Sequence, residues 1–133
     1  MDGKLKHLEF IQNVITRMNS NSFLIKGWTV TLISALFALA AKDANIQYVF
    51  VSYIVIPLFW LLDGFFISQE RQYRCLYDEV CDKNEVDIDF SMNASKFNSG
   101  RNTWSSGILS KTLCPFYGIT VSVTIFVMFI ISR

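Results

Sequence analysis

The stretch QYVFVSYIVIPLFWLLDGFFIS, residues 47–68, decides the fold because Asp63 is its only charged residue. A helix needs about 20 apolar residues to cross a hydrocarbon core about 30 Å thick, so this stretch predicts a transmembrane helix. Residues 23–41 and 112–131 share the pattern, with Lys26 as the only charge in the first and none in the second. The sequence therefore predicts an all-α membrane protein with three transmembrane helices.

The composition of the whole chain agrees with a membrane protein. Its 133 residues are 52% apolar and 17% charged, whereas soluble domains contain about 25% charged residues. The net charge of +1 provides no general attraction for nucleic acid, so we expect no nucleic-acid partner. Residues 38–40, ALA, resemble a signal-peptide cleavage site. Residues 1–22 are too long and too amphipathic for the basic region of a signal peptide, so we expect the first apolar stretch to be retained.

The positions of Lys and Arg predict the orientation, because cytoplasmic segments are enriched in these residues. With the N-terminus in the cytoplasm, all 12 Lys and Arg residues except Lys42 and Arg133 lie on or near the cytoplasmic side. We therefore expect residues 1–22 and 69–111 to be cytoplasmic. Residues 23–68 then form an antiparallel transmembrane hairpin, and the third transmembrane helix ends in the periplasm.

Apolar residues recur at spacings of three and four before the first apolar stretch. They are Leu5, Leu8, Ile11, Ile15 and Met18. This pattern predicts an N-terminal amphipathic helix over residues 1–22. The helix could lie on the membrane surface or pack against protein, and its mixed polar face favours protein packing. Residues 19–22, NSNS, could form a bend or an N-cap for the first transmembrane helix.

Helical spacing also continues beyond the second apolar stretch. The apolar positions there are Tyr73, Leu76, Tyr77 and Val80, so residues 69–83 predict a cytoplasmic extension of the second transmembrane helix that ends at Asn84. Residues 86–90 alternate as in a short strand, but an extended connector fits the pattern equally well. Residues 91–110 are rich in Ser, Asn and Gly and predict a loop.

The sequence contains no catalytic or cofactor motif, so we expect no enzyme activity and no cofactor. His7 is the only histidine and is expected to be solvated, and no HExxH, GxSxG or Walker-type pattern is present. The cysteines 75, 81 and 114 lack CxxC spacing, so we expect no zinc site and favour free thiols, although Cys114 could be lipidated. The acidic run over residues 78–89 lacks the spacing of a calcium loop and is interpreted as a solvated helix end.

Lys26 and Asp63 are the strongest functional candidates. A charge at the centre of a transmembrane helix costs roughly 2.5–3.5 kcal/mol on insertion scales. The two residues lie at similar depth in an antiparallel hairpin, so they could pair within one subunit or between subunits. Lys26 could instead extend to the headgroups, whereas the shorter Asp63 cannot reach as far. Gly64, next to Asp63, would permit close approach of another helix.

Further candidates follow from small and amphipathic side chains. Gly27 and Trp28 join Lys26, Asp63 and Gly64 as candidates for a pore or a contact between subunits. Small residues on two of the spans would also support association; they are Ser34, Ala35, Ala38, Ala41, Gly118 and Ser122. Candidates for binding a cytoplasmic partner are Arg71, Arg74, Tyr77 and Trp104.

Several short runs occur in a characteristic order: ITRM at 15–18, NSFLIKGW at 21–28, FWLLDG at 59–64 and QER at 69–71. Together they resemble the RipA-type octameric membrane proteins, a group of small bacterial membrane proteins, with the likeness strongest over the first 80 residues. The resemblance implies a ring-shaped homo-oligomer that permeabilises the bacterial inner membrane as an antiphage abortive-infection effector. It also implies a cytoplasmic phage trigger, such as a phage assembly protein.

Three functions remain open on these grounds. The leading hypothesis is a homo-oligomeric pore or membrane-disrupting effector, motivated by the small-residue faces and the two intramembrane charges. The first alternative is a non-pore accessory or regulatory subunit that recruits a cytoplasmic partner through residues 1–22 and 69–111. The second is a three-span phage holin.

Overall fold

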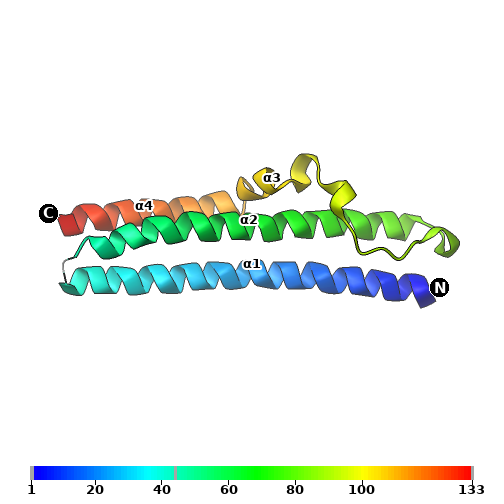
Figure 1. Cartoon of the computed structure of the whole chain (residues 1–133), viewed down its shortest axis with the longest axis horizontal. Helices are drawn as coiled ribbons and strands as arrows, with labels where there is room; N and C mark the ends of the chain where they lie inside the picture. Colours follow the sequence, from blue (N-terminus) through cyan, green and yellow to red (C-terminus); the bar gives the residue numbers. More distant parts are fainter. Residues whose placement is uncertain (1, 44, 133) are drawn as a thin grey trace.

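The structure of the chain is a computed structural model that describes residues 2–43 and 45–132. Two long helices, α1 (Asp2–Asp43) and α2 (Gln47–Asp82), lie side by side and antiparallel, and α4 (Leu113–Ser132) packs against the first half of α2 (Figure 1). Each of the three is long and apolar enough to cross a membrane. The prediction of three apolar spanning helices is therefore confirmed, and the described residues contain no strand.

α1 is one uninterrupted helix of 42 residues. The predicted bend or N-cap at residues 19–22 is wrong, because these residues are helical within α1. The Ser22 hydroxyl donates to the side chain of Asp63 on α2, so it does not cap the backbone. Ser22 and Thr29 are the buried residues of α1 between Ile15 and Ile33, so the buried face of the helix continues through this region with polar side chains.

α2 is also continuous and contains Pro57. It extends past residue 68 and ends at Asp82, where the Lys83 N–H donates to the Val80 carbonyl. The Nζ of Lys4 donates to the carbonyls of Cys81 at 3.0 Å and Lys83 at 2.8 Å. A cation at a helix C-terminus satisfies carbonyls that have no partner within the helix. The start of α1 therefore stabilises the end of α2.

An apolar core lies between the N-terminal half of α1, the C-terminal half of α2 and the connector, residues 83–112, that joins α2 to α4. Its buried members are Ile11, Ile15, Leu76, Val80, Ile88 and Ala94. We call this end of the molecule the outer half and the opposite end the inner half. The side chains of Leu5 and Phe10 are 59% and 48% exposed, so the apolar and polar faces of this part of α1 are only partly separated. Ile11 and Ile15 nevertheless pack against protein.

The connector consists of short turns: η1 (Glu85–Asp87), η2 (Ser95–Phe97), η3 (Gly100–Asn102) and the single helix α3 (Trp104–Ile108). The strand considered for residues 86–90 does not form. The extended-connector alternative is also only partly right, because Val86 and Asp87 belong to the turn η1 and Phe90 has a φ of 58°. Val86 is 91% exposed while Ile88 is buried, but no neighbouring strand is present to pair with this segment in the described part of the chain.

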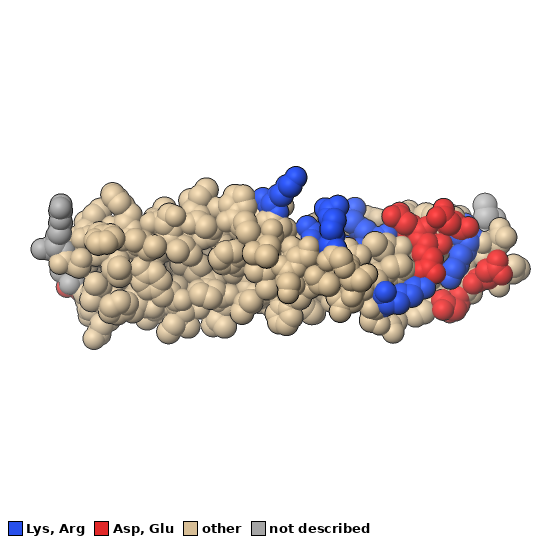
Figure 2. Space-filling model, turned by 90° about the horizontal axis from the view of Figure 1, so that it is seen from above, with Lys and Arg blue, Asp and Glu red and all other residues tan. Residues whose placement is uncertain are grey.

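The inner halves of the helices have a second and smaller core. It contains Ile33 of α1, Ile56 of α2, and Leu113 and Tyr117 of α4. On the face in Figure 2, charged residues gather over one end of the elongated molecule and the other end is almost free of them. This division matches the apolar stretches read from the sequence.

Candidate functional site

The carboxylate of Asp63 is completely buried between the helices. Its Oδ2 lies 2.7 Å from the Nζ of Lys26 on α1, so the two charges of the apolar stretches pair within one chain. The side chain of Lys26 is 18% exposed and that of Asp63 is not exposed at all. A buried carboxylate is tolerated only when it is paired and hydrogen-bonded, and both conditions are met.

Two hydroxyl groups complete the surroundings of Asp63. The Ser22 hydroxyl donates to Oδ1, and the Tyr117 hydroxyl of α4 donates to Oδ2 at 3.0 Å. The Nζ of Lys26 also donates to the Ser22 Oγ at 2.8 Å. Asp63 therefore binds side chains from both other apolar helices, and its four-residue cluster (Ser22, Lys26, Asp63 and Tyr117) connects α1, α2 and α4.

Neither hydroxyl partner was predicted from the sequence. Ser22 lies in a stretch that suggested a cap, although its four-residue spacing from Lys26 places both on one helix face. Tyr117 lies 54 residues from Asp63, and no local pattern relates the two. The Tyr117 ring is fully buried and stacks on the indole of Trp60, with the centroids 5.6 Å apart.

The Lys26 side of the cluster is open to a cavity of about 410 Å³. Its lining includes Ser22, Lys26, Glu70, Arg71 and Thr112. Tyr117 therefore closes the cluster on the α4 side. The cluster is accessible from the opposite side, at the level where the apolar stretch of α2 ends and α4 begins.

Gly64 allows a very close approach, as predicted, but the approaching element is α3 of the same chain. A Cβ added to Gly64 would lie 2.5 Å from Cγ1 of Ile108, and one added to Gly107 would lie 2.5 Å from the Gly64 carbonyl oxygen. Two indoles hold α3 in place: Trp60 Nε1 donates to the Ile108 carbonyl and Trp104 Nε1 to the Leu61 carbonyl, both at 2.8 Å.

Gly27 and Trp28 lie apart from the Asp63 cluster. A Cβ at Gly27 would meet no atom within 4 Å, and Trp28 is 59% exposed. Together with Phe23, Leu24 and Thr31 they line an apolar hollow of about 300 Å³. The five predicted pore or oligomer residues thus divide into three that pack inside the chain and two on its open surface.

The predicted partner-binding residues are mostly engaged within the chain. The Arg71 guanidinium donates to the Arg101 carbonyl at 2.6 Å, and Arg74 pairs with Glu70 at 2.8 Å. Tyr77 is half-buried against the outer core, and Trp104 is 50% exposed despite its hydrogen bond. Burial, and next the neighbouring charge of Arg101, lower the pKa of Arg71.

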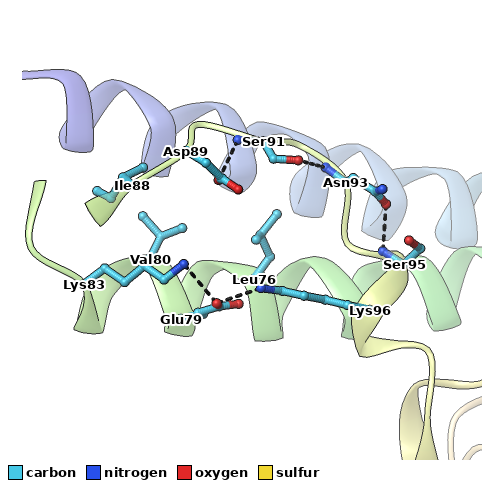
Figure 3. Close-up of a pocket in the computed structure, with 10 residues that line it drawn as sticks. All are labelled: Leu76, Glu79, Val80, Lys83, Ile88, Asp89, Ser91, Asn93, Ser95 and Lys96. Carbon is cyan, nitrogen blue, oxygen red and sulfur yellow. Dashed lines mark hydrogen bonds and ion pairs between the residues drawn. The ribbon is translucent and has the colours of Figure 1, made fainter. Parts of the chain in front are cut away.

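A polar pocket of about 200 Å³ lies between the end of α2 and the connector (Figure 3). Glu79 pairs there with Lys96 at 2.7 Å and with Lys83 at 3.1 Å. The hydrogen bonds from these two lysines, Lys96 first, lower the pKa of Glu79. Opposite them, side chains at 89, 91 and 93 each accept from the backbone N–H two residues later. These bonds order the connector without a strand.

His7 is buried, at 3% exposure, which corrects the expectation of a solvated histidine. Its Nε2 lies 3.0 Å from the Ser91 carbonyl, because the connector folds back over α1. The three cysteines are free thiols. In residues 2–43 and 45–132 no group of three His, Cys, Asp or Glu side chains could hold a metal ion.

The fold and the cluster define a chain with three membrane-spanning candidates and a buried Lys–Asp pair. Comparison with protein-family models, with curated proteins and with solved structures found no match. The likeness to RipA-type octameric membrane proteins therefore stays a prediction.

Proposed function

We propose that the chain is a subunit of a homo-oligomeric pore or membrane-disrupting assembly in the bacterial inner membrane. The observation that carries this proposal is the uncovered surface of its apolar helices. Only 17%, 22% and 11% of the residues in the most apolar windows of α1, α2 and α4 are buried within the chain. Lipid or further copies of the chain must cover the rest.

The uncovered surface contains small residues at positions suited to helix association. Ser34, Ala35, Ala38 and Ala41 of α1 are all exposed, as is Ser122 of α4. A Cβ at Gly118 would also meet open space. Small side chains allow helix backbones to approach closely in a bilayer, where close packing and interhelical hydrogen bonds drive association. These two faces are the proposed contacts between subunits.

In this proposal the Asp63 cluster holds the three apolar helices of each subunit in one arrangement. Residues 1–22 and 69–111 lie in the cytoplasm as an amphipathic helix, a helical extension and a connector, and the C-terminus is periplasmic. A cytoplasmic phage component, such as an assembly protein, would bind this end and trigger an octameric ring in abortive infection. The Lys and Arg distribution and the resemblance described above support these assignments.

Induced expression in bacteria with a potential-sensitive dye tests the proposal. We expect the wild-type chain to depolarise the membrane, and Asp63→Asn to reduce this effect because Lys26 loses its partner. Asp78→Asn is the matched control, since Asp78 is an exposed carboxylate on the same helix. If Asp63→Asn depolarises cells as strongly as the wild type, the cluster has no role in the activity.

An accessory subunit is the second candidate, and the connector favours it. Val86 is 91% exposed and Phe90 49% exposed at the charged end of the molecule, where exposed apolar side chains suit contact with another protein. In this case the wild-type chain leaves the membrane potential unchanged. Deletion of the connector would then abolish co-purification of a cytoplasmic partner. A holin would instead cause timed lysis together with an endolysin.

A further inference from the structure

Three cations surround a second cavity, of about 490 Å³, where the connector meets α4. Arg71, Arg101 and Lys111 line it together with the hydroxyl-bearing residues Ser106, Ser110 and Thr112. Arg71 and Thr112 also line the neighbouring cavity that reaches Lys26. The two cavities are therefore adjacent, and we call them together the boundary site. The boundary site lies at the level where the apolar stretch of α2 ends and α4 begins.

The cations of this cavity form no ion pair within the described residues. Lys6, Lys26, Arg74, Lys83 and Lys96 each form an ion pair, but Arg71, Arg101 and Lys111 form none. Glu70 lines the Lys26 cavity and partly offsets the charge of Arg71, but its ion pair is with Arg74 at 2.8 Å. In the described part of the chain Arg101 and Lys111 thus have no acid partner, and Arg71 has only the shared Glu70. Three cations around one cavity that also contains hydroxyl groups favour an anion with several oxygen acceptors, and guanidinium groups suit phosphate.

Apolar side chains at the edge of the boundary site indicate the source of that phosphate. Leu109 lines the Arg71–Lys111 cavity and is 69% exposed. Phe23 lines the Lys26 cavity and is 78% exposed. A free phosphate ion would gain nothing from these side chains, whereas acyl chains would cover them. Basic groups beside the end of a transmembrane helix attract anionic lipids.

We propose that the boundary site binds the phosphate of an anionic phospholipid headgroup, with its acyl chains against Leu109 and Phe23. Arg101 and Lys111 approach the headgroup from the connector, and Arg71 from α2. The headgroup of the bound lipid, with one negative charge, would offset part of the positive charge of the three cations and would join the connector to the start of α4. This inference requires the chain to be in a membrane but does not depend on pore formation or on oligomer number.

The test uses the full chain in a non-ionic detergent and native mass spectrometry. Dioleoyl phosphatidylglycerol is titrated against dioleoyl phosphatidylcholine, which has the same acyl chains. We expect the wild-type chain to prefer phosphatidylglycerol. Arg101→Gln/Lys111→Gln should bind it roughly 30-fold more weakly, since each cation near an anionic lipid surface contributes about a fivefold gain. Both side chains are exposed, so the variant should fold.

The matched control is Arg17→Gln/Lys42→Gln, which removes the same charges from two exposed positions outside both cavities. Equal loss in both double variants, or no preference for phosphatidylglycerol in the wild type, would overturn the proposal. Displacement of the lipid by equimolar inorganic phosphate would also overturn it and assign the site to a free anion. If the double variant elutes as an aggregate, Lys111→Gln against Arg17→Gln provides the same comparison, with a fivefold loss expected.

Discussion

The two halves of this molecule differ in what their buried contacts between helices contain. In the outer half, apolar side chains of α1, α2 and the connector form the core, with Ile11 and Ile15 at its centre. In the inner half, polar contacts that converge on Asp63 join all three helices beside the apolar core. A membrane location of the inner half would account for this difference, because burial of apolar surface drives packing in water but not between helices surrounded by lipid.

Loss of the Asp63 charge is the largest expected disruption of the inner half. Asp63→Asn leaves the ammonium of Lys26 without a counter-ion, so we expect the free energy of unfolding to fall by about 3–5 kcal/mol. Chemical unfolding in detergent micelles measures the loss. Asp78→Asn should change it by much less. The double variant Lys26→Met/Asp63→Leu should recover most of the stability, and failure to recover it would mean that the charges were not coupled.

Truncation in the outer half tests whether its core behaves like that of a soluble protein. Ile11 is fully buried, so Ile11→Ala should lower the free energy of unfolding by about 2–5 kcal/mol. Leu5→Ala is the control on the same helix, because Leu5 is 59% exposed, and it should have little effect. Similar losses for both variants would show that Ile11 is not packed as described.

The contact between α2 and α3 should tolerate no added methyl group. Gly107→Ala places a Cβ 2.5 Å from the Gly64 carbonyl oxygen, and overpacking of this kind costs about 1–3 kcal/mol. Limited proteolysis of the connector should become faster in this variant. Gly27→Ala, which meets no atom within 4 Å, should leave the proteolysis rate unchanged.

The smallest expected effect is a response of the connector to acid. Lys96 and Lys83 lower the pKa of Glu79, so their stabilising contribution is complete above the usual carboxyl pKa of about 4.3 and disappears as the pH falls through the lower value. Unfolding measured between pH 7 and pH 3 should show a smaller decrease for Glu79→Gln than for the wild type. Identical pH profiles would mean that these lysines do not stabilise the folded carboxylate.

Features with a local sequence pattern were predicted well. The three apolar helices and the continuation of α2 past residue 68 follow from spacing along the chain. The pairing of Lys26 with Asp63 was one of the alternatives left open, and the structure has it within one chain. Residues 19–22 were misinterpreted because NSNS favours a cap when read alone, whereas α1 continues through them and the Ser22 hydroxyl donates to Asp63 instead of capping the backbone.

Features formed by distant segments were not predictable in the same way. The Tyr117 hydroxyl reaches Asp63 across 54 residues, and His7 is covered by a connector 84 residues away. The small residue Gly64 correctly indicated a close approach, but no pattern identified α3 as the approaching helix. Such contacts depend on how the connector folds, and its Ser- and Asn-rich sequence has no periodicity to reveal it.

The central claim is that the uncovered apolar helices associate with copies of the same chain. The mass of the complex extracted in a mild detergent tests this most directly. We predict a discrete multiple of the 15.3 kDa chain, eight copies if the resemblance to the octameric family holds. A stable 15.3 kDa monomer, in mild detergent and in lipid nanodiscs alike, would contradict the claim.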